Sequence, residues 1–184
     1  MSRVLVLRFK LPPFTSRRDQ ATVRKLDFFM RQTFPRRPLR LPSTFGSPVY
    51  FITFCTYRRR PILATHAIHD EFIRFCQNAV RDHNVFVGRY VIMPDHLHFF
   101  VAGDLNFHVG KWIRSLKQAL GKKISLAKDH SRIWQEGFFD HALRSDESMA
   151  QKWDYIRENP VQAGLVSDLV NWPYQGEIAL IDRT

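Results

Sequence analysis

The hydrophobic residues of this chain follow two spacings, the alternation typical of strands and the three-to-four-residue return typical of helices. Stretches dense in β-branched and aromatic residues indicate strands. These are predicted at 49–57, 85–93, 96–101 and, interrupted by a glycine, 133–143. Amphipathic helices are predicted at 66–83 and 106–125. The order is β-α-β-β-α-β, which favours an α+β, ferredoxin-like fold: an antiparallel sheet with both helices on one face.

A further helix is predicted after this unit. Ser145 is its expected N-cap, and two acidic residues follow in the first turn, where the helix dipole favours them. The helix is expected to end near Asn159, because Pro160 disfavours helical backbone at the residue before it. Tyr155 and Asn159 are four residues apart and are therefore expected on one face of this added helix. The tail after it is predicted to be a loop or an edge strand.

Residues 1–45 differ in composition from the rest of the chain. They alternate basic residues with prolines and lack a sustained period, so we expect a mostly extended, disordered basic arm. The folded domain is therefore placed at 46–184. Met30 is an alternative start, in which case residues 1–29 are not part of the natural protein.

The net charge of +11 is typical of a protein that binds a polyanion, but most of it lies in this arm. Residues 1–40 hold 11 Lys/Arg and two Asp/Glu, which leaves a net charge of only +2 for residues 41–184. The apolar stretches are too short for a membrane span, and the N-terminus lacks a convincing signal peptide, so we expect a cytoplasmic protein. Cys55 and Cys76 lie in apolar runs without CxxC spacing, which predicts free thiols.

The candidate chemistry centres on residues 91–101, VIMPDHLHFFV. In a strand, His96 and His98 share one face and apolar residues occupy the other. Their side chains start about 7 Å apart, so the two imidazoles can converge on one divalent ion. A pair of half-exposed histidines is the alternative interpretation, because a bare His-x-His motif also occurs by chance.

Tyr155 on the added helix is the second candidate. A tyrosine that faces such a strand is suited to metal-assisted attack on phosphate, with a covalent phosphotyrosine as the product. The ester would retain the bond energy, so no nucleotide cofactor is needed. A helix-surface aromatic with its hydroxyl in water is the alternative interpretation of Tyr155, and spacing alone does not decide between the two.

Two groups of basic residues are candidates for phosphate contacts. The 106–125 helix has no acidic residue, and its polar face carries Lys111, Arg114, Lys117, Lys122 and Lys123. A solvated face usually mixes charges of both signs, so contact with DNA or RNA is favoured for this helix. Arg58, Arg59 and Arg60 follow the first strand, where a phosphate clamp and a solvated loop both stay open.

Four stretches of the chain carry a resemblance to a known family. They are VYFITFCTYRRRPIL, YVIMPDHLHFFV, IWQEGFFDHALRS and KWDYIRENPVQAGLV. In this order they resemble the REP-associated tyrosine transposases, a branch of the single-tyrosine insertion-sequence transposases of the HUH superfamily. The resemblance implies a ferredoxin-like fold and cleavage and rejoining of single-stranded DNA beside imperfect palindromic hairpins, through a 5′-phosphotyrosine.

The same resemblance implies roles for individual residues. It implies that His96 and His98 bind Mg or Mn, that Tyr155 is the nucleophile, and that Asn159 is a further metal ligand. Both a monomer and a homodimer are compatible with the family. A relaxase or replication-initiation protein of the same superfamily is an open alternative.

Two alternatives without transposition also stay open. One is a ferredoxin-like nucleic-acid-binding protein without catalysis, whose strand aromatics Tyr50, Phe51 and Phe54 stack on bases. The other is a domesticated descendant that binds hairpins and has lost transposition.

Overall fold

The computed structural model describes residues 39–40, 48–125, 132–143 and 149–181. Its strands are β1 (Leu39–Arg40), β2 (Tyr50–Cys55), β3 (Phe86–Ile92), β4 (His96–Ala102), β5 (Phe139–Ala142), β6 (Gln175–Glu177) and β7 (Ala179–Leu180). Its α-helices are α2 (His66–His83), α3 (Val109–Ser125), α4 (Met149–Arg157) and α5 (Asn159–Gln162). Two 3-10 turns, η2 (Tyr57–Arg59) and η3 (Leu169–Asn171), complete the described elements.

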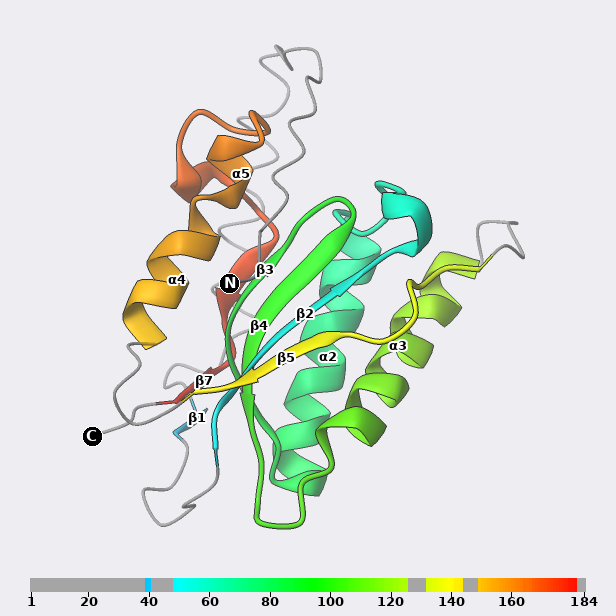
Figure 1. The fold of residues 1–184 in the computed structure, drawn as a ribbon, viewed down its shortest axis with the longest axis vertical. Coiled ribbons are helices and arrows are strands. Elements are labelled where there is room, and N and C mark those ends of the chain that lie inside the picture. The colour runs from blue at the N-terminus through cyan, green and yellow to red at the C-terminus, as the bar shows by residue number, and fades with distance from the viewer. Residues whose placement is uncertain (1–38, 41–47, 126–131, 144–148, 182–184) are drawn as a thin grey trace, which may run out of the picture.

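The main sheet has the strand order β5-β2-β4-β3-β6, and all its neighbours are antiparallel. Helices α2 and α3 cover one face of this sheet and α4 lies on the other (Figure 1). The predicted ferredoxin-like fold with an added C-terminal helix is therefore confirmed. Strands β1 and β7 form a separate, parallel two-stranded sheet.

The fourth strand is shorter than predicted. Only Phe139–Ala142 form β5, whereas 133–143 was expected to be one strand. Gly137 has a φ of +70°, in the left-handed region that turns a strand aside. On the far side of this turn, Trp134 keeps a single isolated bridge to Thr56.

The C-terminal part follows the prediction in outline and differs in one detail. Helix α4 ends at Arg157 and α5 begins at Asn159, with Pro160 in its first turn, so Tyr155 and Asn159 belong to consecutive helices rather than to one. The expected edge strand in the tail is β6, which pairs with β3. The predicted cap Ser145 lies outside the described residues. So does the predicted basic arm, apart from the two residues of β1.

The sheet separates two hydrophobic layers, as the alternation along β4 requires. Leu97, Phe99 and Val101 pack against α2 and α3. Phe100 belongs to the other layer, which includes Ile156 of α4. Cys76 is buried and Cys55 is half-buried, and both are free thiols as predicted. No helix among the described residues is long and apolar enough to span a bilayer.

A polar pair is enclosed in the layer beneath α2. His69 is only 2% exposed, and its Nε2 lies 2.8 Å from the hydroxyl of Tyr90, which is fully buried. Burial, and secondarily the nearby His66, lowers the pKa of His69 to about 4. Protonation of His69 therefore opposes folding, because the unfolded chain takes up this proton at a higher pH, near 6.5.

The buried His69–Tyr90 pair predicts that the unfolding free energy of the protein falls in acid. The contribution of His69 to stability is complete above about pH 6.5 and is lost as the pH falls toward about 4. Between about pH 7 and pH 5, the wild type is expected to lose about 2 kcal/mol more unfolding free energy than His69→Gln. Urea titrations at the two pH values measure this, with exposed His83→Gln as the matched histidine control. Equal losses in wild type and His69→Gln would contradict the assignment.

Candidate active site

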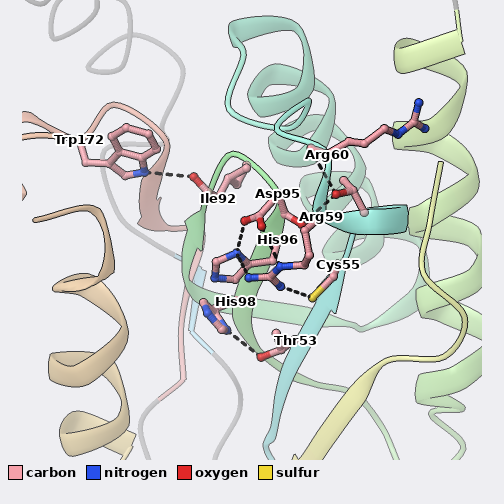
Figure 2. Close-up of polar contacts among 10 residues, drawn as sticks. Thr53, Cys55, Arg59, Arg60, Ile92, Asp95, His96, His98 and Trp172 are labelled. Atoms are coloured by element: carbon pink, nitrogen blue, oxygen red, sulfur yellow. Dashed lines mark hydrogen bonds and ion pairs between the residues drawn. The ribbon is translucent and has the colours of Figure 1, made fainter. Parts of the chain in front are cut away.

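The two histidines of β4 project from the sheet face that α4 covers. Their ring centroids are 4.7 Å apart and the rings are nearly perpendicular, at 86° (Figure 2). The antiparallel register places Thr53 opposite His98 and Cys55 opposite His96. The expected convergence of the two imidazoles is therefore present in the fold.

Each histidine is held through its Nδ1 atom. The Nδ1 of His98 lies 2.7 Å from the Thr53 hydroxyl, and the Nδ1 of His96 lies 2.6 Å from an Asp95 carboxylate oxygen (Figure 2). When each Nδ1–H donates to these oxygens, each Nε2 keeps a lone pair for an ion. This outer-shell arrangement is the one that protein metal sites use to orient histidine ligands.

The local electrostatics favour a neutral His98. Burial lowers its pKa to about 3, and the charges of His96 and Arg59 act in the same direction. Burial raises the pKa of Asp95, but the His96 hydrogen bond and the charges of His96 and Arg59 outweigh it and hold that pKa below its usual range. The site thus contains an ionised carboxylate, that of Asp95, and a neutral imidazole, that of His98, and neutral imidazole is the form that binds metal.

The three consecutive arginines, at positions 58–60, make different contacts. Arg59 lies 2.7 Å from Asp95, its guanidinium donates to the Cys55 thiol at 2.7 Å, and it approaches His96 Nδ1 at 3.3 Å (Figure 2). Arg60 instead donates to a backbone carbonyl, that of Arg132. Arg58 lies over the ring of Tyr57, 5.3 Å from its centroid. The three side chains therefore do not form one clamp.

Thr56 links two turns: the one at residues 57–60, which carries the three arginines (the arginine turn), and the one at residues 93–95, which precedes the two histidines. Arg58 and Arg59 have φ values of 54° and 56°, a conformation that costs a non-glycine residue about 1–2 kcal/mol. The fully buried Thr56 hydroxyl lies 2.7 Å from the carbonyl oxygen of Arg60 and 3.1 Å from that of Asp95, and its single proton is shared between them. Its backbone N–H also donates to the Asp95 carbonyl. Nothing in the local sequence distinguishes this threonine, because Asp95 lies 39 positions away along the chain.

Tyr155 lies on the helix that covers the histidine face. Ile156 belongs to the hydrophobic layer and Trp153 packs against it, and together they anchor α4. The Tyr155 side chain is 59% exposed, and it makes no hydrogen bond with any residue that the structure describes. Asn159 is half-buried at the start of α5. Tyr155 and the histidines are thus on the same side of the sheet but not in contact.

Helix α3, with its basic residues, packs on the face of the sheet opposite to α4 (Figure 1), whereas the histidines lie on the α4 side. Lys111, Arg114 and Lys122 are exposed there. Lys117, which is predicted as a phosphate contact, is half-buried and engaged within the protein. Its ammonium donates to the backbone carbonyls of Gln135 and Gly137 and lies over the Phe54 ring, and burial lowers its pKa. Lys117 therefore fastens the segment before β5 to the core.

The side chains at this site can supply some, but not all, of the ligands that a divalent ion needs. His96 and His98 can each offer an Nε2 atom, because their Nδ1 atoms are engaged by Asp95 and Thr53. Within the described part of the chain, no group of three or more His, Cys, Asp and Glu side chains is placed to share an ion. The remaining coordination positions would therefore fall to an amide oxygen, water or a phosphate oxygen.

Comparison with known proteins shows which family this chain is similar to. Residues 46–159 match the family described as "Transposase IS200 like". The chain is similar to the REP-associated tyrosine transposase of Escherichia coli K12, with 32% identity over 97 residues that cover 51% of this chain and 55% of that protein. The match therefore spans about half of that relative's length.

Two further similarities agree with the first. A Haemophilus influenzae protein named for the same group is 28% identical over 138 residues, which cover 68% of this chain and 77% of that one. The fold matches the solved structure of a REP-associated tyrosine transposase bound to a REP hairpin. That match has a TM-score of 0.55 and 22% identity, and it covers 77% of this chain and 80% of the other.

Thr56→Val tests whether the two turns depend on the Thr56 hydroxyl. Valine keeps the shape but removes the hydroxyl, while the two carbonyls keep their backbone N–H donors from Ile62 and Thr56. The unfolding free energy is therefore expected to fall by about 0.5–1.5 kcal/mol. Thr56→Ser, which keeps the hydroxyl, is expected to lose clearly less. Urea denaturation of the three proteins measures the difference. A Thr56→Val protein as stable as wild type would show that the hydroxyl does not hold the turns.

Proposed function

The chain belongs to the IS200-like transposase family, whose members cleave DNA, and we propose that it cleaves and rejoins single-stranded DNA at REP-like hairpins through a covalent 5′-phosphotyrosine. The observation that carries this proposal is the His96–His98 pair, with both Nδ1 atoms engaged and both rings on the α4 side of the sheet. A nucleic-acid-binding protein without catalysis does not require this arrangement.

His96 and His98 are proposed to hold Mg²⁺ or Mn²⁺ through their Nε2 atoms, and Asn159 is proposed as an amide oxygen ligand. The ion, when bound, would polarise the scissile phosphate and stabilise its developing negative charge. The hydrogen bonds to Thr53 and Asp95 orient the two rings. The low pKa of His98 keeps its lone pair available.

Tyr155 is the proposed nucleophile. Its phenolic oxygen attacks phosphorus, the bond from phosphorus to the 3′ oxygen of the preceding nucleotide breaks, and that oxygen leaves as a 3′-hydroxyl. The proton lost by the phenol balances the one gained by the 3′ oxygen. Rejoining reverses these steps, so no nucleotide cofactor is consumed. The exposure of Tyr155, 59%, is consistent with access by a DNA strand.

The DNA contacts are proposed to involve two surfaces. Arg58 and the exposed cations of α3, Lys111, Arg114 and Lys122, are available for phosphate oxygens. Arg59 and Arg60 are engaged within the protein, so their proposed contribution is a positive potential near the histidines. Hairpin DNA as the partner is supported by the relative that was solved with a REP hairpin.

The covalent step is tested with hairpin DNA from the flanks of the gene. Wild type with Mn²⁺ is expected to give a protein–DNA adduct that survives denaturing electrophoresis. Tyr155→Phe, or EDTA, is expected to abolish it, because the phenol oxygen or the ion is then missing. Tyr174→Phe removes another partly exposed phenol and is expected to retain the adduct. Hairpin binding without adduct under every metal tried would favour the non-catalytic alternative, and an adduct in Tyr155→Phe would exclude Tyr155 as nucleophile.

The outer-shell role of Thr53 is tested by metal affinity. Thr53→Val removes the hydroxyl that orients His98, so Mn²⁺ affinity is expected to fall about 10–100-fold. Thr53→Ser is expected to stay close to wild type, because it keeps the oxygen. The free Mn²⁺ signal in electron paramagnetic resonance gives the affinity, and circular dichroism checks the fold. Unchanged affinity in Thr53→Val would remove Thr53 from the site.

A further inference from the structure

A groove of about 590 Å³ lies between α3 and the segment that leads into β5. Figure 1 shows this segment running alongside α3, at the edge of the sheet. We propose that the groove binds an unpaired nucleotide of a single-stranded DNA segment. This inference rests on the proposed function and identifies a second point of contact for the same substrate. The volume falls within the range of about 300–1,000 Å³ that small-ligand sites occupy.

Positive charge with little acidic compensation lines the groove. Arg114 is exposed and forms no ion pair with any residue that the structure describes. Lys117 is satisfied by backbone carbonyls rather than by a carboxylate, so its charge is not neutralised. Arg132 pairs with Glu136 at 3.3 Å, but Glu136 is 90% exposed, and such surface pairs are weak. The groove therefore attracts an anion such as a DNA phosphate.

Aromatic rings line the same groove as these cations. Trp134 and Phe138 are both partly buried there. Trp134 is fixed in place, because its indole N–H donates to the Lys117 carbonyl at 2.9 Å and its ring meets Phe54 edge to face, with centroids 5.2 Å apart. Cations combined with pre-positioned aromatic rings are typical of sites for unpaired bases. Duplex DNA offers mainly its phosphates to such a surface.

The groove is connected to the candidate active site through the arginine turn. Arg60 donates to the Arg132 carbonyl at 2.8 Å. Arg58 and Arg132 both lie over the Tyr57 ring, each 5.3 Å from its centroid. The same turn carries Arg59, which contacts Asp95 beside His96. The turn at residues 57–60 thus contacts both the groove, through Arg132, and the candidate active site, through Asp95.

Gly110 offers a way to fill the groove without changing its charge. It lines the groove, and beyond its own helix backbone and chain neighbours no atom lies within 4 Å of the position that its Cβ would occupy. A Cβ there meets no steric obstacle, and leucine is a better helix former than glycine. Gly110→Leu is therefore expected to narrow the groove, whereas Arg114→Ala removes one of its charges.

The experiment measures binding of the full chain to a labelled, unstructured oligothymidine and to a blunt duplex of the same length. Fluorescence anisotropy is recorded in EDTA, so that cleavage does not interfere. Gly110→Leu and Arg114→Ala are each expected to weaken oligothymidine binding about tenfold, with less than about twofold change for the duplex. Arg81→Ala removes one exposed charge at the end of α2, from a residue that does not line the groove, and is expected to change neither by more than about twofold. Circular dichroism checks that each variant is folded.

Three results would overturn the inference: no binding of oligothymidine by wild type, wild-type affinity in Gly110→Leu, or equal losses for strand and duplex. An effect of Arg81→Ala as large as that of Arg114→Ala would also overturn it, because net charge alone would then explain the binding. The Tyr155 adduct, assayed separately on hairpin DNA, keeps the two proposals apart. If the adduct forms but the groove variants bind oligothymidine like wild type, the proposed function is supported and the groove proposal is wrong. If the groove variants bind oligothymidine more weakly but no adduct forms, the groove proposal is supported and the proposed covalent mechanism is wrong.

Discussion

The antiparallel register between β2 and β4 is the constraint on which the candidate active site depends. It sets Thr53 opposite His98 and Cys55 opposite His96, so that a hydroxyl, a thiol and two imidazoles share one face of the sheet. A slip of one residue would turn both histidines toward the layer beneath α2 and α3 and expose Leu97 and Phe99. Burial of those apolar side chains, which are almost completely inaccessible, therefore fixes the positions of the polar groups on the other face.

The turns at the ends of these strands complete the arrangement. Thr56 joins the turn after β2 to the turn before β4, and this brings Arg59 to Asp95 and Asp95 to His96. The left-handed backbone at Arg58 and Arg59 is unfavourable by itself, and the buried Thr56 hydrogen bonds offset its cost. The same turn touches Arg132, so the histidine site and the groove beside α3 share one structural support.

Periodicity in the sequence was sufficient to predict the fold and the side of the sheet on which the histidines lie. Alternation along 96–101 and helical spacing in 66–83 are local signals, and the structure follows them. The partners of the site were not predictable in this way. The contacts of Thr53 with His98, of Thr56 with Asp95 and of Arg59 with Asp95 join residues 36 or more positions apart. The carbonyl partners of Lys117 were not predictable for the same reason, because they come from the segment before β5 rather than from its own helix.

The most direct test of this account is the position of the ion. A crystal of Tyr155→Phe grown with Mn²⁺ and hairpin DNA would locate the metal by its anomalous scattering. We predict one Mn²⁺ bound by the Nε2 atoms of His96 and His98, with the Thr53 and Asp95 contacts to Nδ1 preserved. An ion held elsewhere, or bound through Nδ1 after loss of these contacts, would contradict the assignment of the histidine pair as the centre of the active site.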